Sequence, residues 1–476
     1  MTTTKGIVSA VLLSLCIAPF AAAKVYVRWT YQQLPPVKTL GVSDLVLSSG
    51  DDAKSLVEAA IKRGYHVYLE TTADKAPATA ELSFKVGAVG IIIEAEVAKQ
   101  AEAETAAQRL KTEYPKLKIL VLDSGGHQPD MRGWLVFNKN GVLQVSSPTS
   151  QPWLDSNLPL VRYEEAFQKT QAPLYSFAWD TTDALVKQQG PRPEDYELAI
   201  AEAGALHADL ILDIHERQQK GLAEGDKATL SDWELVKRAL AFYEQGGASS
   251  AQAAAAVAVL TDDYDSCYEP LNLMGRHNIP YRVLRSSQAT AQDLAGLDVV
   301  IAFAEPSREL TQVLFRLAQS GGVAVLVNLK GPFPWQSDPA PAASGPSVTF
   351  TVGKGRVIEL REPIIDPETF ARDVRRLMRK EQVPVSLWNS LTTLVVSYPG
   401  KASGGVTVEL VNYAEESTQV QVQVKGRFRA VRYQTTEHAK WESLKPSVVD
   451  GFTEFVVPDI LIGGRVELSG AEASVQ

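Results

Sequence analysis

Along the first half of the chain, the hydrophobic positions form short runs that end at an acid and are followed by a helical pattern. The clearest is KVGAVGIIIEAE (85–96), whose branched apolar run ends at Glu94. Runs of this kind are typical of parallel strands that are covered on both faces. Residues 95–116 are rich in helix formers, so the repeating unit is a strand, an acid and a helix. Similar runs end at Glu70, Asp123, Asp180 and Asp213.

Eight such strand-like runs precede residue 215. They cover 24–31, 43–49, 65–70, 86–94, 117–123, 141–147, 172–180 and 208–214. Alternating strands and helices predict a parallel sheet, and eight repeats favour a closed (β/α)8 TIM-like barrel over a doubly wound open sheet. In a closed barrel the carboxyl ends of all strands open on one face, so the acids at these ends are expected to converge on one cleft.

The second half of the chain changes pattern twice. After a small polar stretch at 246–255, four buried-type strands with helices between them predict a flavodoxin-like α/β domain over 249–385. Beyond Val385 the helical pattern stops, and short alternating runs predict a small C-terminal antiparallel β-sandwich over 386–476. The predicted fold is therefore α/β, with a barrel at 24–248 followed by these two domains.

The first 23 residues have the pattern of a secretory signal peptide. A polar start with Lys5 is followed by an apolar core from Ile7 to Phe20, which is shorter than the roughly 18–20 residues that a spanning helix needs. An uncleaved membrane anchor is the weaker alternative. We therefore expect cleavage near Ala23, a periplasmic or secreted protein without a membrane span, and Cys267 as the remaining cysteine.

Composition and charge limit the classes of partner. A chain of 476 residues with 45% hydrophobic and 22% charged residues is globular and long enough for two to four domains. The formal net charge of −9 and the lack of a Lys/Arg-rich run argue against nucleic acid as a partner. The GKG at 353–355 lacks the pattern of a phosphate-binding loop, and the barrel range holds few histidines. We expect neither a metal nor a cofactor.

Three segments of the second half carry a family resemblance. They are LNLMGRHNIPYRVL (271–284), VGKGRVIELREPIIDPETFARDVRRLM (352–378) and VELVNYAEESTQVQVQVKGRF (408–428). These segments are similar to parts of bacterial glycosyl hydrolase-like proteins. The order of the parts resembles that of the beta-galactosidases, which carry an amidotransferase-like trimerisation domain between a barrel and a β-sandwich.

The resemblance implies an exported glycoside hydrolase-like protein that acts on an oligosaccharide or glycan and forms a homo-oligomer. It places the acid/base carboxylate at the end of the fourth strand and the nucleophile at the end of the seventh, where this chain has Glu94 and Asp180. Because the strand at 322–328 is not followed by a cysteine, the amidotransferase-like domain is expected to be non-catalytic.

The two carboxylates fit the chemistry of glycosidic cleavage, in which one carboxylic acid protonates the leaving oxygen and a second carboxylate attacks the sugar or activates water. Each also has a simpler interpretation. Glu94 could stabilise a helix N-terminus, an effect worth about 0.3–1 kcal/mol, and Asp180 could cap the next helix. The chain departs from the family at Ile93, where Asn is usual, and at Asp180, where Glu is usual. A carbohydrate-binding protein without turnover, or a structural role in assembly, is therefore the alternative.

Further polar and aromatic residues near the strand ends are candidates for binding sugar. The eighth-strand cluster could also supply the second carboxylate in place of Asp180. An aromatic residue on a barrel strand is more often part of the core, so the aromatic candidates have that alternative. The candidates are Arg28, Trp29, Glu70, Asp123, Tyr175, Trp179, Asp213, His215 and Glu216.

Overall fold

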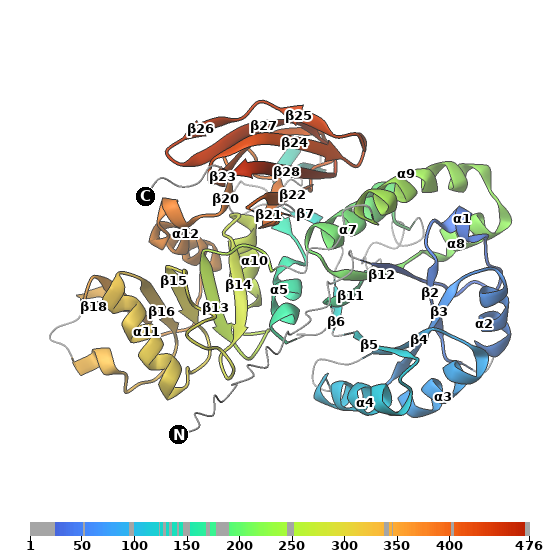
Figure 1. The fold of residues 1–476 in the computed structure, drawn as a ribbon, viewed down its shortest axis with the longest axis horizontal. Helices are drawn as coiled ribbons and strands as arrows, with labels where there is room; N and C mark the ends of the chain where they lie inside the picture. The colour runs from blue at the N-terminus through green and yellow to red at the C-terminus, as the bar shows by residue number, and fades with distance from the viewer. Residues whose placement is uncertain are drawn as a thin grey trace, which may run out of the picture.

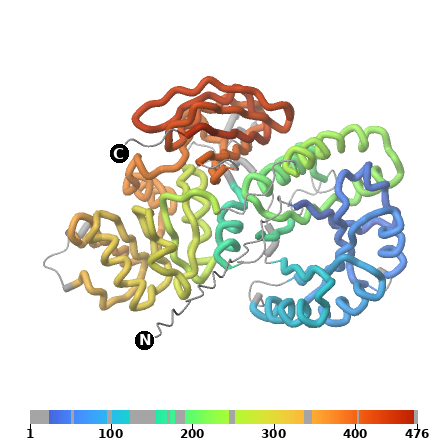
Figure 2. Tube along the Cα trace, in the orientation of Figure 1, coloured from blue at the N-terminus to red at the C-terminus, as the bar shows by residue number. Residues whose placement is uncertain are grey.

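The fold is seen in a computed structural model (Figure 1). It describes residues 24–50, 53–94, 100–122, 124–126, 130–132, 136–139, 142–145, 153–167, 172–177, 190–244, 252–337, 342–344, 346–400 and 404–471. Figure 2 separates the chain by colour into a blue-to-green barrel, a yellow α/β part and an orange-to-red β part. Within the described residues, no helix has the length and the apolar character needed to span a membrane.

The N-terminal sheet is parallel throughout and nearly closes into a barrel. Its strands are β1 (Val25–Arg28), β2 (Asp44–Ser48), β3 (His66–Thr72), β4 (Gly90–Glu94), β5 (Lys118–Leu122), β6 (Ser124–Gly126), β11 (Leu174–Phe177) and β12 (Asp209–Asp213). β5 pairs with β4, and β6, which begins two residues after β5 ends, pairs with β11. Counting the short β5 and β6 as one strand position gives a nearly closed barrel of seven parallel strands, so the predicted TIM-like fold is confirmed.

The barrel has seven parallel strands among the described residues, whereas the sequence predicts eight. The predicted sixth strand at 141–147 contains β9 (Val142–Val145), which pairs antiparallel with β8 (Val136–Lys139) outside the barrel. A second antiparallel pair joins β7 (Asp130–Arg132) to β10 (Trp153–Asp155). The sequence between β8 and β9 is Asn140-Gly141, which is a strong hairpin signal, so this correction could have been made from the sequence.

Strand alternation divides the barrel's side chains between its interior and its outer, helix-covered face. One residue from each of seven strands forms the interior core, and these are Tyr26, Val46, Tyr68, Ile92, Leu122, Leu174 and Ile211. The alternate residues pack against the surrounding helices. Those helices are α1 (Val37–Leu40), α2 (Ala53–Lys62), α3 (Ala76–Val86), α4 (Gln100–Glu113), α7 (Pro193–Ala205), α8 (Glu216–Glu224) and α9 (Lys227–Glu244).

The α/β part contains one mixed sheet in the order β14-β13-β15-β16-β19-β18-β17. The strands are β13 (Val257–Thr261), β14 (Tyr281–Arg285), β15 (Val299–Ala302), β16 (Val323–Val327), β17 (Ala342–Ser344), β18 (Ser347–Val352) and β19 (Gly355–Leu360). The helices are α10 (Tyr268–Arg276), α11 (Arg308–Ser320) and α12 (Pro367–Leu377). Helix α5 (Leu158–Phe167), from the range assigned to the barrel, packs against β14. Cys267 is buried, and burial raises the pKa of its thiol to about 12, as expected of an unreactive cysteine.

The C-terminal part consists of two antiparallel sheets that enclose a common apolar core, as the sequence predicts. One contains β20 (Val385–Leu387), β23 (Thr418–Lys425), β26 (Ser447–Val449) and β27 (Phe452–Ile460). The other contains β21 (Thr393–Pro399), β22 (Val406–Asn412), β24 (Phe428–Thr435), β25 (Glu442–Leu444) and β28 (Gly463–Ala471).

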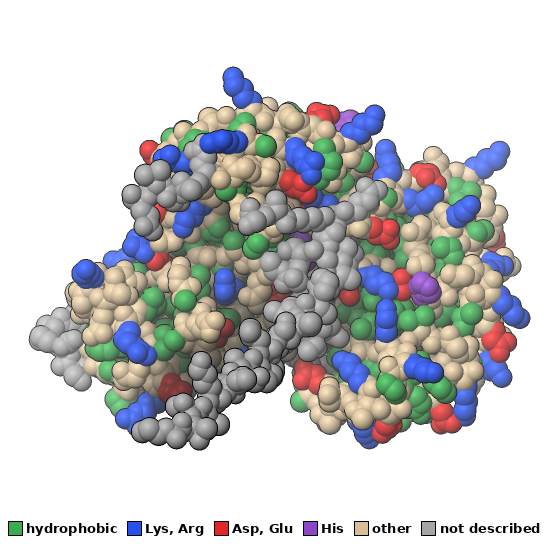
Figure 3. Space-filling model, in the orientation of Figure 1, with side chains coloured by type: hydrophobic (Ala, Val, Ile, Leu, Met, Phe, Trp, Pro, Cys, Tyr) green, Lys and Arg blue, Asp and Glu red, His purple; other side chains and the backbone are tan. Residues whose placement is uncertain are grey.

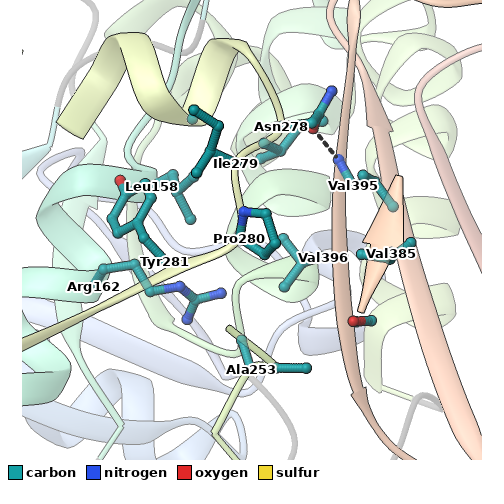
Figure 4. A pocket seen from close by; sticks show the side chains of 14 residues that line it. Leu158, Arg162, Ala253, Asn278, Ile279, Pro280, Tyr281, Val385, Val395 and Val396 are labelled. Carbon is teal, nitrogen blue, oxygen red and sulfur yellow. Dashed lines mark hydrogen bonds between the residues drawn. The ribbon is translucent and has the colours of Figure 1, made fainter. Parts of the chain in front are cut away.

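The three parts meet around a cavity of about 20 Å³, which is large enough for one water molecule (Figure 4). Buried Arg162 of α5 donates to Glu165 (2.6 Å) and to the Tyr398 hydroxyl of β21 (3.4 Å). Asn278 links the α/β part to β21, because its Nδ2 donates to the Thr393 carbonyl (2.9 Å) and its Oδ1 accepts from the Val395 amide (2.8 Å). These contacts fix the sandwich against the other two parts.

We expect Asn278→Ala to weaken this junction by about 1–3 kcal/mol, because it leaves two backbone groups of a buried strand without partners. Asn278 also has a φ of 50°, a conformation that Asn tolerates better than Ala. Asn278→Gly is the matched control, since it loses the same hydrogen bonds without backbone strain. Thermal unfolding should show a lower melting temperature for both variants, with Ala the lower. A melting temperature unchanged in both would contradict the role given to Asn278.

Candidate functional site

The carboxyl ends of the barrel strands place a layer of polar side chains directly above the interior core. By strand alternation, residues two positions beyond the core residues share their face. In β1, β3 and β12 these are Arg28, Glu70 and Asp213, and in β4 it is Glu94. The sequence prediction that the acids of these strands converge on one face of the barrel is met for Glu70, Glu94 and Asp213.

Arg28 joins two of these carboxylates. Its Nη1 donates to both oxygens of Asp213, at 2.8 and 2.7 Å, and its Nε donates to Oε2 of Glu70 at 2.9 Å. Its Nη2 donates to the second oxygen of Glu70. The guanidinium therefore binds Glu70 through two nitrogens, Nε and Nη2, and Asp213 through one, Nη1. Such charge-assisted pairs are both strong and geometrically specific. We call Arg28, Glu70 and Asp213 the arginine bridge.

The charges of this layer affect one another. Burial works against the charge of Arg28, but its hydrogen bonds and its attraction to Glu70 and Asp213 leave its pKa raised. Burial raises the pKa of Asp213, the positive charge of Arg28 opposes that rise, and the negative charge of Glu94 adds to it. Glu94 therefore lies close enough to Asp213 for electrostatic repulsion, although the two strands are not neighbours in the sheet.

Glu94 differs from the two bridged carboxylates. It is the last residue of β4, it is exposed, and its carboxylate has no ion pair within the described part of the chain. The preceding Ile93 is fully buried and packs with the core on the helix side. Glu94 is thus an exposed carboxyl group at the barrel mouth, next to two carboxylates that form ion pairs with Arg28.

Two predicted sugar-binding aromatics belong to the core instead. Trp29 is 1% exposed, and its indole nitrogen donates to the carbonyls of Tyr31 (2.8 Å) and Gln33 (3.1 Å). Tyr175 is 2% exposed and packs in the same helix-facing core. Both follow the alternation of their strands away from the barrel interior, so the prediction that they contact ligand was wrong. The more frequent interpretation of a barrel aromatic, as a core residue, holds for both.

His215 and Glu216 lie just beyond β12, where the chain turns into α8. His215 is the N-cap, and its Nδ1 accepts a hydrogen bond from the Arg217 amide at 3.3 Å, while its own amide donates to the Tyr196 hydroxyl at 2.9 Å. Gly190, with a φ of 75°, lies against the imidazole so closely that a Cβ there would be 2.7 Å from the ring. Glu216 is exposed in the first turn of α8. The imidazole therefore has a structural capping role.

Three predicted site residues, Asp123, Trp179 and Asp180, lie outside the described residues. Their roles remain predictions. Among the described residues, no group of three or more His, Cys, Asp or Glu side chains is arranged to hold a metal ion.

Sequence reasoning missed two small residues of the same layer. Ser48 ends β2 and pairs in register with Glu70, and Ser176 of β11 pairs with Ile211. Both lie two positions beyond an interior core residue of their strand. The period of two along each strand would have identified them. Ser48 is exposed and Ser176 is buried.

No family model matches the sequence, and no curated protein matches it either. Several solved structures do match it. Alpha-L-fucosidase isoenzyme 2 from Paenibacillus thiaminolyticus is 12% identical, with a TM-score of 0.61 over 95% of this chain and 100% of that chain. The chain shares its fold. The beta-galactosidase from Bacillus circulans sp. alkalophilus is 11% identical, with a TM-score of 0.50 over 94% of this chain and 99% of that chain. The predicted likeness in architecture to beta-galactosidases is confirmed at the level of fold.

Proposed function

We propose that the protein is an exported glycoside hydrolase-like protein that acts on an oligosaccharide or glycan at the mouth of its barrel. Glu94 is the general acid and Asp180 the partner carboxylate. The observation that carries the proposal is the exposed Glu94 carboxyl at the end of β4, beside the arginine bridge. The fold shared with a fucosidase and a beta-galactosidase supports carbohydrate as the ligand class.

The arginine bridge assigns different roles to the acids. The oxygens of Glu70 and Asp213 accept hydrogen bonds from Arg28, so both carboxylates are engaged in ion pairs. Carboxylates of this kind suit the hydroxyl groups of a sugar. Glu94 has no ion pair within the described residues and is exposed, so its carboxyl group is accessible to a ligand, whereas that of Asp213 is bound to Arg28. We therefore assign the role of proton donor to Glu94 on its position and accessibility.

One observation favours the second candidate, a carbohydrate-binding protein without turnover. Of the described carboxylates in this layer, Glu70 and Asp213 are both committed to Arg28, so cleavage depends on Asp180 as the second carboxylate. If Asp180 is not within catalytic reach of Glu94, the same mouth would bind glycan without cleaving it. The two candidates share the ligand and the site, and they differ only in turnover.

The face of the molecule in Figure 3 has basic and acidic side chains interspersed, with no basic patch of the kind that binds nucleic acid.

Export and homo-oligomer formation are parts of the proposal that rest on the leader pattern and on the family resemblance. Light scattering on the mature protein tests the oligomer, and a monomer at micromolar concentration would remove that part of the proposal.

The function is tested with a panel of 4-nitrophenyl glycosides that includes the α-L-fucoside and the β-D-galactoside. Release of 4-nitrophenol from any of them supports the hydrolase. Binding of a glycoside without release supports the second candidate. Neither binding nor release across the panel would contradict both.

A further inference from the structure

The opposite end of the barrel carries a second set of charged groups around Lys24, the residue directly before β1. The Lys24 main-chain nitrogen donates to Oδ1 of Asp209 at 2.9 Å, and its carbonyl accepts from the Leu210 amide at 2.9 Å. Its Nζ donates to Oδ1 of Asp44 at 2.6 Å and lies 3.5 Å from the Tyr68 hydroxyl. Both the main chain and the side chain of Lys24 are therefore fixed. We call Lys24, Asp44 and Asp209 the floor cluster.

The floor cluster holds two carboxylates and the single ammonium group of the Lys24 side chain. Burial raises the pKa of Asp209 to about 7, and the Lys24 hydrogen bond and charge counteract that rise only in part. The side chain of Asp44 is only 8% exposed and is already paired with the Lys24 ammonium. Asp209 therefore accepts a hydrogen bond from an uncharged amide nitrogen, at a buried position where a cation would stabilise its carboxylate.

Removal of the leader would change this one atom. We propose that hydrolysis of the Ala23–Lys24 bond converts the Lys24 main-chain nitrogen into an α-ammonium group that forms an ion pair with Asp209 and completes the barrel floor. The cleavage is carried out by a leader-processing peptidase with one water molecule. The C–N bond breaks, the water oxygen becomes part of the Ala23 carboxylate, and the nitrogen retains its hydrogen and gains two protons.

The position of the cut follows from the same contacts. A chain that begins at Lys24 has its α-ammonium 2.9 Å from Asp209 and keeps both the Leu210 hydrogen bond and the Asp44 ion pair. A chain cut one residue later loses all of these contacts. A chain cut one or more residues earlier keeps an uncharged amide against Asp209. The floor cluster is therefore matched to a mature N-terminus at Lys24, and processing stabilises the barrel through β1.

Other charged and titratable groups also face this cluster. They are Tyr26 on β1, His66 and Tyr68 on β3, Lys118 on β5 and Glu244 on α9. Lys118 lowers the pKa of Asp209 and Asp44 raises it. Since these groups are the same before and after processing, they cancel in a comparison of two N-termini.

The test uses the full chain with two N-termini. One form begins at Lys24, released from a fusion by a protease that cuts directly before this residue, and the other begins at Ala21 and carries three extra alanines. Each is made with Asp209 and with Asp209→Asn. The Lys24 form should melt a few degrees higher than the extended form, and the difference should vanish in Asp209→Asn.

The pH dependence has a fixed sign. In the extended form Asp209 has a folded pKa of about 7, above its unfolded value near 3.8, so stability is lost as the pH rises through this window. In the Lys24 form the α-ammonium favours the ionised carboxylate, which reduces that loss. The difference in melting temperature between the two forms should therefore grow from pH 5 to pH 7. A constant difference would contradict the ion pair.

A direct readout is the reactivity of the α-amine. At pH 7 its acylation, followed by mass spectrometry, should be at least about tenfold slower in the Lys24 form than in the peptide KVYV, because an exposed α-amine has a pKa near 7.7–8.0 and the ion pair raises it. Asp209→Asn should restore fast labelling. Should that variant not fold, the peptide comparison still decides. Equal rates in protein and peptide, or an exported protein that begins at another residue, would overturn the proposal.

Discussion

Glu94→Gln is expected to lower the turnover of any cleaved 4-nitrophenyl glycoside by about 10²–10⁴-fold, the usual contribution of general acid catalysis. The substitution keeps the shape of the side chain and removes its proton. Binding of the glycoside should survive, so the effect should appear in kcat and not in KM. Initial rates over a range of glycoside concentrations measure both.

Glu81→Gln is a matched control, because Glu81 is an exposed carboxylate on α3 whose described partner is Lys85. It should leave the kinetics unchanged. A pH profile adds a second criterion, since loss of the acid should remove the limb on which rate falls as pH rises. Glu94→Gln with wild-type kcat would remove Glu94 from the mechanism. Glu216, which is exposed just beyond β12, would then be the next candidate.

Arg28→Met is expected to destabilise the barrel by about 3–5 kcal/mol, because it leaves the half-buried Glu70 and Asp213 carboxylates close together without their cation. The same change should raise the pKa of Asp213 further, because the charge and the hydrogen bond of Arg28 that oppose the rise are removed. Stability would then fall as pH rises above the ordinary pKa of an aspartate, since the folded state would hold a proton that the unfolded state releases. Thermal unfolding between pH 5 and pH 8 measures the effect.

The rescue is the triple variant Arg28→Met, Glu70→Gln, Asp213→Asn, which removes the charges together and keeps the shapes. Its melting temperature should recover most of the loss and should be nearly independent of pH in this window. If the triple variant is no more stable than Arg28→Met, the cost lies in the packing of the arginine and not in its ion pairs.

Much of the fold is predictable from the sequence because buried parallel strands have a strong local signal. The runs ending at Glu70, Glu94 and Asp213 became β3, β4 and β12, and the C-terminal alternation became the sandwich. The site could be predicted in part for the same reason. A charged residue at a strand end is recognisable in the sequence, and the topology of a barrel brings such ends together.

The errors have physical causes that act at longer range. Trp29 and Tyr175 are on correctly predicted strands but face the helices, and the face of a residue depends on register with the interior core. The arginine bridge joins residues 28, 70 and 213, a contact that no local pattern contains. Helix α5 packs on β14, and its local sequence does not identify that strand as its partner.

The central claim, that the barrel mouth is a carbohydrate site, is tested most directly by saturation-transfer NMR with the 4-nitrophenyl glycosides on the wild type and on Ser48→Trp. Ser48 is exposed at the end of β2 and pairs in register with Glu70, so an indole there adds bulk beside the arginine bridge without removing a carboxylate. Lys62→Trp, at the far end of α2, controls for an added surface aromatic. We expect transfer to the sugar protons in the wild type and in Lys62→Trp, and its loss in Ser48→Trp. Equal transfer in all three proteins would place the ligand elsewhere and contradict the claim.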